Sequence, residues 1–176
     1  KFPPEHGGVG VPIFFQSVIW AEFGTSANMA LSVLPALTVG VYEVLVEHGE
    51  KELVDYFAKN IASGKWSGTM CLTEPHAGTD LGMISTKAVP QNDGSYHLTG
   101  TKIFITYGEH DMTENIVHLV LAKTPDAPKG TKGISLFLVP KFMPSGWNFE
   151  GLSEMTSDLN SEHNGVPCSG SEEKMG

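Results

Sequence analysis

The spacing of the apolar residues changes near residue 65, and this change restricts the possible folds more than any other feature. Before it, apolar side chains recur at helical spacing, as Leu53, Phe57 and Ile61 do. After it, short apolar runs are separated by turn residues, as at Asn92-Asp93-Gly94, a typical hairpin signal. We therefore predict an α+β chain whose helical part comes first and is followed by an antiparallel β part.

Three helices are expected in the helical part. They run from Pro12 to about Phe23, from Ser26 to about His48, and from Glu50 to a stop at Ser63-Gly64. Pro12 suits a first helical turn, Gly24 a helix stop and Ser26 an N-cap. The second helix is apolar on nearly all sides, which predicts that it is buried, and Pro35 is expected to kink it.

Six strands are expected in the β part. Their ranges are Trp66–Thr73, Ile84–Val89, Ser95–Thr99, Thr101–Thr106, Ile116–Lys123 and Gly133–Pro140. From Pro144 onward the sequence is acidic and rich in Gly, Ser and Asn, which is typical of an exposed loop, and a strand is expected again near Lys174. The predicted divisions are a helical part over 1–65, a β domain over 66–143 and a loop over 144–176.

The composition argues against several classes of function. The 176 residues have a net charge of −9, and no basic patch suited to nucleic acid is present among the 11 basic residues, all of them lysine. No apolar run reaches the ~18–20 residues of a membrane span, although 29–46 comes closest. Cys71 and Cys168 are too few for a disulfide framework, so we expect a reducing compartment.

Two segments carry the candidate chemistry, one beginning at Met70 and the other covering 100–106. Alternation places Cys71 with Thr73 on one face of the first strand, and Phe104 with Thr106 on one face of the second, with Ile103 and Ile105 toward the core. We consider the case in which the two strands lie side by side. Two hydroxyl groups and an aromatic ring would then form a shelf for a flat heteroaromatic ring. The alternative is that threonine simply favours strands.

The loop after Pro75 offers small residues and backbone N–H groups. Its sequence, Ala77-Gly78-Thr79-Asp80, can form an anion-binding nest, or it can be a plain turn. The loop lacks the lysine of a P-loop and the spacing of a dinucleotide-binding motif. Asp80 is expected to brace the loop and not to contact a phosphate.

Other reactive side chains favour structural roles. Glu74 is a candidate base, but the adjacent proline and turn favour a structural role for it. The group His76, Glu109, His110 and Asp111 lacks the spacing of metal ligands, so we interpret these residues as surface loop residues. Cys71 is interpreted as a small apolar filler. No nucleophile elbow of a serine hydrolase occurs.

The same two segments resemble signatures of the acyl-CoA dehydrogenase family. Residues 73–80, Thr73 to Asp80, resemble its T-E-P-x-A-G-S/T-D motif, and Gly100 to Thr106 resemble its G-x-K-x-W/F-I-T motif. Residues 7–12 resemble the segment that leads into the family's helical domain, and 174–176 its K-M-G. Together these matches cover almost the whole chain in the right order.

Further details resemble one large-subunit branch of that family. They are residues 70–76, 109–112 and 133–137. The branch includes the 3-methylmercaptopropionyl-CoA dehydrogenases, so their substrate is among those that the resemblance implies.

The resemblance implies a barrel-like middle β domain that binds FAD. The residues that it assigns to the cofactor are Met70, Cys71, Leu72, Thr73, Gly78, Thr79, Phe104, Ile105 and Thr106. Thr73 would contact the pyrimidine edge of the flavin, and Thr106 would lie near its N5. Thr79 replaces the commoner serine and would also bind the acyl-CoA substrate.

The implied reaction is the oxidation of an acyl-CoA thioester to the 2,3-enoyl-CoA. A base removes the α proton, the β hydride passes to flavin N5, and an electron-transfer flavoprotein then accepts the electrons. The family's catalytic glutamate, its C-terminal helical domain and its arginine contact to FAD would lie beyond Gly176. The 176 residues alone are therefore expected to be inactive and to bind FAD weakly or not at all. The resemblance also implies a homodimer or homotetramer, and we expect a bacterial cytoplasmic protein.

Two alternatives remain open from the sequence. One is a flavin monooxygenase on the same scaffold, which would react rapidly with O₂ after reduction. The other is a non-catalytic relative that binds a flavin or an acyl-CoA.

Overall fold

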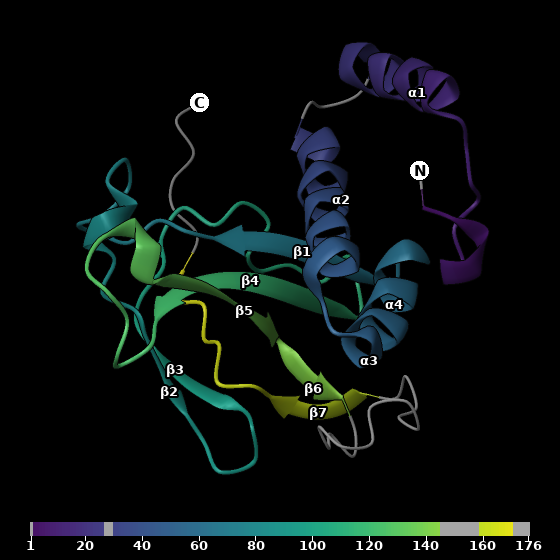
Figure 1. Cartoon of the computed structure of the whole chain (residues 1–176). Helices are drawn as coiled ribbons and strands as arrows, with labels where there is room; N and C mark the ends of the chain where they lie inside the picture. The colour runs from purple at the N-terminus through teal and green to yellow at the C-terminus, as the bar shows by residue number, and fades with distance from the viewer. Residues whose placement is uncertain (1, 27–29, 145–158, 171–176) are drawn as a thin grey trace.

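A mixed sheet with helices at one end forms the molecule (Figure 1). The computed structural model describes residues 2–26, 30–144 and 159–170. The helices are α1 (Ile13–Ser26), α2 (Ala30–His48), α3 (Lys51–Leu53) and α4 (Lys59–Ala62), with a π-helical turn over Val54–Ala58 and 3-10 turns over Pro4–His6, Leu81–Met83 and Thr131–Gly133. The strands are β1 (Trp66–Cys71), β2 (Lys87–Pro90), β3 (Tyr96–Thr99), β4 (Asn115–Lys123), β5 (Ile134–Pro140), β6 (Phe142–Pro144) and β7 (Leu159–His163).

Strand β4 is the centre of the larger sheet. It pairs with β1 in parallel and, along its other edge, with β5 in an antiparallel ladder. At its carboxyl end Lys123 also pairs with Lys87 of β2, which forms the predicted hairpin with β3. Because β1 is short, β2 follows it along the same edge of β4.

The predicted all-antiparallel pairing is wrong, because β1 and β4 run parallel. The hairpin signal at Asn92-Asp93-Gly94 determines only the direction of its two adjacent strands. Strands β1 and β4 are separated in sequence by several loops and by the β2–β3 hairpin. No local pattern sets their relative direction. Parallel neighbours need such a long connection.

The expected barrel is not confirmed, because in the part of the chain that the structure describes the sheet is open. Strand β3 pairs only with β2, and β5 pairs only with β4. The sheet is nevertheless curled, since the rings of Tyr96 on β3 and Phe137 on β5 lie 5.0 Å apart between centroids. An aromatic contact, and not a hydrogen-bonded ladder, brings the two edges together.

The main core lies between the helices and β1. Phe57 and Ile61 have no exposed surface, and Trp66 is 1% exposed. Helix α2 also protects the free edge of β1, since the backbone N–H of Gly68 donates to the Thr38 hydroxyl at 3.1 Å. Covering an edge in this way removes a site for unwanted strand pairing.

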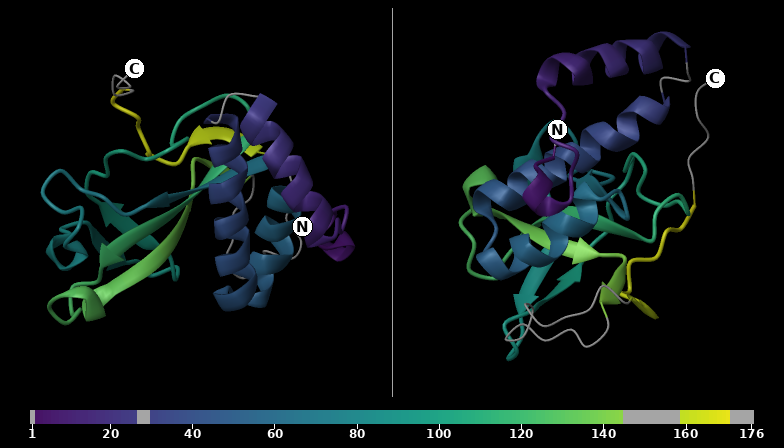
Figure 2. Two further views of the ribbon diagram at one scale, coloured as in Figure 1. Left: turned by 90° about the horizontal axis from the view of Figure 1, so that it is seen from above. Right: turned by 90° about the vertical axis from the view of Figure 1, so that its right-hand side faces the viewer.

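Helix α1 stands apart from the sheet, with α2 between them (Figure 2). It exposes several large apolar side chains, among them Ile13 (75%) and Phe14 (69%). None of the helices within 2–26, 30–144 and 159–170 combines the length and hydropathy that a bilayer span requires.

The positions of the helices follow the predictions with small corrections. Gly24 does not end the first helix, which continues to Ser26, so the predicted N-cap Ser26 belongs to α1, and the described part of the second helix covers Ala30–His48. Pro35 lies inside α2, as expected. The third helical stretch ends at Ala62, directly before its predicted stop at Ser63-Gly64, and a π-helical turn, which no sequence signal indicates, interrupts it over Val54–Ala58.

Several strand predictions need correction, among them Ile84–Val89, whose strand begins only at Lys87, and one prediction lies outside the described residues. The first strand ends at Cys71 and not at Thr73, and 101–106 form no strand because Phe104 has a left-handed backbone (φ 57°). The predicted exposed loop contains β7, which pairs with β6. The strand expected near Lys174 lies outside the described residues. The divisions at residues 65 and 143 remain predictions.

A Gly68→Ala substitution is expected to destabilise the protein by about 1–3 kcal/mol, because it overpacks the contact between α2 and β1. A Cβ at this position would lie 2.7 Å from Val41 Cβ. Thermal unfolding measures the loss. The matched control is Gly40→Ala, where nothing lies within 4 Å and the exchange should stabilise α2 by about 0.5–1 kcal/mol. Equal melting shifts of the same sign would contradict the prediction.

Candidate functional site

The first candidate segment leaves β1 and turns back on itself. Glu74 and Ala77 exchange two backbone hydrogen bonds of 2.8 and 3.0 Å, with Pro75 and His76 at the tip of the turn. Farther on, the Asp80 carboxylate accepts from the Gly82 N–H at 2.9 Å. Asp80 thus braces the loop, as predicted, and Gly78 and Thr79 remain exposed between these two fixed points.

The second candidate segment lies against the first. The backbone N–H of Ile103 donates to the Thr73 carbonyl at 2.9 Å, so the predicted neighbour relation is confirmed although 101–106 is no strand. The predicted alternation also persists without a strand. Phe104 and Thr106 are exposed, whereas Ile103 and Ile105 are half-buried.

Phe104 has two unusual properties. Its backbone is left-handed, which costs a non-glycine residue of order 1 kcal/mol. The residue is 70% exposed, although its side chain is large and apolar. An aromatic ring held in a strained conformation toward solvent offers a flat surface to a ligand.

Glu74 has the structural role that the sequence favours. It is 2% exposed, and its two carboxylate oxygens accept hydrogen bonds from both the N–H and the hydroxyl of Ser85 and of Thr86. Lys102 adds a further bond, with its Nζ 2.9 Å from Oε1 of Glu74. With these lone pairs occupied, Glu74 is poorly placed to act as a base.

Burial alone would raise the pKa of Glu74. The hydrogen bonds from Thr86, Lys102 and Ser85 outweigh that effect and hold the pKa of this carboxyl far below its ordinary value of 4.5. Glu74 is therefore a permanent anion at neutral pH, and Lys102 is its counter-charge.

Lys102, Ser85 and Thr86 are residues that sequence reasoning missed. Lys102 is 10% exposed at its side chain, and its Nζ donates to the Leu72 carbonyl at 3.0 Å as well as to Glu74. A lone lysine in an apolar run, next to Ile103, was the available signal. The residues that Lys102 contacts are far from it in sequence, so the sequence did not indicate which residues they are.

Met70 and Cys71 are placed differently from Thr73. Met70 packs against the helical core, and Cys71 is 6% exposed with its Sγ 3.8 Å from Nδ1 of His118. Burial raises the pKa of the Cys71 thiol, which agrees with an apolar filler. Its side chain presents almost no surface to a ligand, so these two residues would line a site mainly through their backbone.

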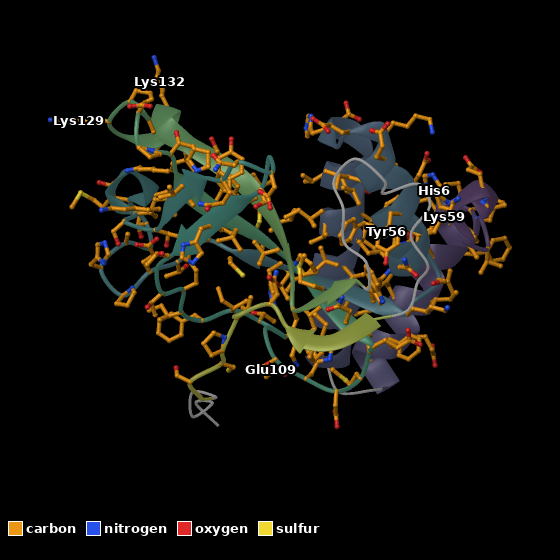
Figure 3. The ribbon with its side chains drawn as sticks, turned by 90° about the horizontal axis from the view of Figure 1, so that it is seen from below. His6, Tyr56, Lys59, Glu109, Lys129 and Lys132 are labelled. Atoms are coloured by element: carbon orange, nitrogen blue, oxygen red, sulfur yellow. The ribbon has the colours of Figure 1, made fainter. Side chains whose placement is uncertain are left out.

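A second polar cluster lies on the same strand as Cys71. The Thr69 hydroxyl is 2.7 Å from Nδ1 of His118, and the Ser67 hydroxyl is 3.1 Å from Nε2 of His110. Within the described residues, no group of three or more His, Cys, Asp and Glu side chains gathers in a way that could hold a metal ion. Glu109 instead pairs with Lys141 and lies far from Lys129 and Lys132 in Figure 3.

The side chains of the two segments are of the kinds that a flavin ring system requires, an apolar aromatic surface and hydroxyl groups. The exposed ring of Phe104 offers a flat apolar surface, and hydroxyl groups are available at Thr73, Thr79 and Thr106. Thr73 also borders the loop, since a Cβ at Gly78 would lie 3.6 Å from its methyl group. Thr73 and the loop thus meet at one corner, and the second segment adjoins them.

Comparison with known proteins agrees with this geometry. Residues 69–164 match the family described as "Acyl-CoA dehydrogenase, middle domain". The chain is 50% identical over 141 residues to the 3-methylmercaptopropionyl-CoA dehydrogenase of Ruegeria pomeroyi, which covers 80% of this chain and 24% of that protein. It is 40% identical over 168 residues to a butyryl-CoA dehydrogenase of Syntrophomonas wolfei, which covers 94% of this chain and 26% of that one.

A solved structure has a similar fold. The structure described as the electron transferring flavoprotein of Acidaminococcus fermentans superposes with a TM-score of 0.68 at 33% identity, over 81% of this chain and 36% of that one. The 176 residues span about a quarter of the length of the two curated relatives. With its middle-domain match over more than half of its length, the chain belongs to the acyl-CoA dehydrogenase family.

Proposed function

We propose that this chain forms the flavin-binding part of an enzyme that oxidises an acyl-CoA thioester to the 2,3-enoyl-CoA. The observation that carries the proposal is the contact between the two segments, made by Ile103 N–H on the Thr73 carbonyl and by Lys102 on the Leu72 carbonyl. This contact brings the backbone next to Phe104 against Thr73, which directly precedes the loop that carries Gly78 and Thr79. The family named by the comparisons supports the reaction class.

The residues that would hold FAD are those of the two segments. They are Met70, Cys71, Leu72, Thr73, Gly78, Thr79, Phe104, Ile105 and Thr106. In this proposal the Thr73 hydroxyl binds the polar edge of the ring system, and Phe104 with Ile105 covers it. Backbone N–H groups at Gly78 and Thr79 bind the pyrophosphate. Bound FAD would supply the acceptor for the hydride.

The substrate is expected to meet the cofactor at Thr79. Its exposed hydroxyl lies on the loop fixed at Glu74 and at Asp80, so it can bind the acyl-CoA without moving the cofactor residues. We propose 3-methylmercaptopropionyl-CoA as the first substrate to test, since the relative from Ruegeria pomeroyi bears that name. Glu74 is not offered as the base, because its lone pairs are occupied.

Further parts of the proposal concern partners. We propose an electron-transfer flavoprotein as the electron acceptor, which the name given to the superposed Acidaminococcus fermentans structure supports. We also propose a homodimer or homotetramer. A bacterial cytoplasmic location completes the proposal, and the bacterial origin of the two relatives supports it. A barrel closed by other parts of the protein would complete the curled sheet.

The test uses the full-length protein. We expect a flavin absorption spectrum in the purified protein and its bleaching by 3-methylmercaptopropionyl-CoA under anaerobic conditions, faster than by butyryl-CoA. A colourless protein that added FAD does not restore would contradict the proposal. Rapid reoxidation of the bleached flavin by O₂ would favour a monooxygenase instead, and unbleached flavin with every acyl-CoA would indicate a non-catalytic relative.

A further inference from the structure

The geometry points to Glu74 and Lys102 as a positioning pair that sets the flavin-binding surface. The inference rests on the proposed function and assigns roles to two residues that need not contact the cofactor. Its basis is that one buried ion pair connects three separate pieces of backbone.

Lys102 connects the two cofactor segments. Its Nζ lies 3.0 Å from the carbonyl oxygen of Leu72 and 2.9 Å from Oε1 of Glu74. Leu72 directly precedes Thr73, and Lys102 lies two residues before Phe104. A single ammonium group thus fixes the hydroxyl side of the proposed site relative to its aromatic side.

Glu74 connects the third piece. Its Oε2 accepts from the N–H and hydroxyl of Ser85 at 2.7 and 2.8 Å, and its Oε1 accepts from those of Thr86 at 3.0 and 2.5 Å. The loop that carries Gly78 and Thr79 begins at Glu74 and returns at Ser85. One carboxylate therefore closes the loop at both ends.

Close packing around this pair gives an independent indication. A Cβ at Gly100 would lie 2.2 Å from the Thr86 hydroxyl and 2.9 Å from Thr86 Cα. The second segment therefore approaches Thr86 at a distance that only glycine permits. The backbone is built to bring Lys102 to the carboxylate.

An ion pair is a costly way to fill this space. Two charges lose their hydration on burial, and apolar side chains of similar volume are often at least as stabilising. What the pair adds is directional bonding, with donors and acceptors on each of the three backbone pieces. It also places opposite charges beside the site, where a charge near a flavin tunes its electronics.

The test compares the full-length wild type with its Lys102→Met variant. Apoprotein is titrated with FAD, and the quenching of flavin fluorescence gives the dissociation constant. We expect it to rise by about tenfold or more when Lys102 is lost. The variant Lys102→Arg, which keeps the positive charge, should recover part of the affinity and serves if Lys102→Met does not fold.

The flavin midpoint potential distinguishes an electrostatic effect of the Glu74–Lys102 pair on the flavin from a merely structural role of the pair. Glu74→Gln leaves the Lys102 cation without its anion and should raise the potential, whereas Lys102→Met leaves the anion and should lower it. General loosening of the structure would weaken FAD binding in both variants without opposite shifts. Such a result would overturn the inference.

Lys141→Met is the matched control. Lys141 is 12% exposed at its side chain and pairs with Glu109. Its backbone N–H donates to the carbonyl of Ile116, so it lies at the other end of β1 and β4 from Leu72. It should leave FAD affinity unchanged. If the wild type binds FAD and the dissociation constant of Lys102→Met lies within twofold of the wild-type value, the inference is overturned and the proposed function is not. A wild type that binds no FAD overturns the proposed function and the inference with it.

Discussion

Replacement of Glu74 by glutamine is expected to destabilise the protein by about 3–5 kcal/mol, because it removes one partner of a buried ion pair. Lys102 would keep its positive charge at a site where its side chain is only 10% exposed. The amide NH₂ of glutamine would also face the N–H and hydroxyl donors of Ser85 or Thr86, so donors would oppose donors.

The measurement is urea unfolding at pH 7, followed by circular dichroism. Glu109→Gln is the matched control, since Glu109 pairs with a lysine of similar burial, Lys141 (12% exposed), but its own side chain is 37% exposed, so the two variants differ in the burial of the glutamate. That change should cost less than about 1 kcal/mol. Equal losses in the two variants would show that burial and the extra hydrogen bonds of Glu74 add nothing.

The substitution Glu74→Gln should also change how the stability of the protein depends on pH. The pKa of Glu74 in the folded protein lies far below its ordinary value of 4.5. A carboxyl of this kind contributes stability above its unfolded pKa, and the contribution is lost as pH falls below that value. Wild type should therefore lose stability between about pH 5 and pH 3 more steeply than Glu74→Gln. Parallel losses over this range would contradict the assignment.

The elements that sequence predicted well are those set by local patterns. The apolar spacing of Leu53, Phe57 and Ile61 places a helix, and Asn92-Asp93-Gly94 places a hairpin, because both signals lie within a few residues. The parallel pairing of β1 with β4 depends on contacts between distant segments, and a local pattern carries no information about such contacts. The curl that brings Tyr96 to Phe137 has the same origin.

The candidate site shows the same division. Alternation predicted that Phe104 and Thr106 share an exposed face and that Ile103 and Ile105 lie inward. It did not predict the left-handed backbone at Phe104, because a phenylalanine carries no signal for that conformation. Nor did it predict the partners of Lys102, since Leu72 and Glu74 are brought to it only by the folded loop.

Truncation of Phe57 to alanine is expected to cost about 3–5 kcal/mol, because its ring is completely buried between the helices and β1. The centroid of the ring lies 5.5 Å from that of Trp66, on the strand, and 5.2 Å from that of Tyr56, in the same π-helical turn. The substitution leaves a cavity shared by the helical part and the sheet.

Phe14→Ala is the matched control, because Phe14 on α1 is 69% exposed and its truncation should change stability by no more than about 0.5 kcal/mol. Urea unfolding followed by circular dichroism compares the two. Since Phe57, Ile61, Trp66 and Val117 belong to one core, we expect Phe57→Ala to lower a single transition. Two separate transitions would contradict this. A single one would mean that residue 65 marks a change of secondary structure within one folding unit, so a loss of helical packing would also reach the two candidate segments that follow β1.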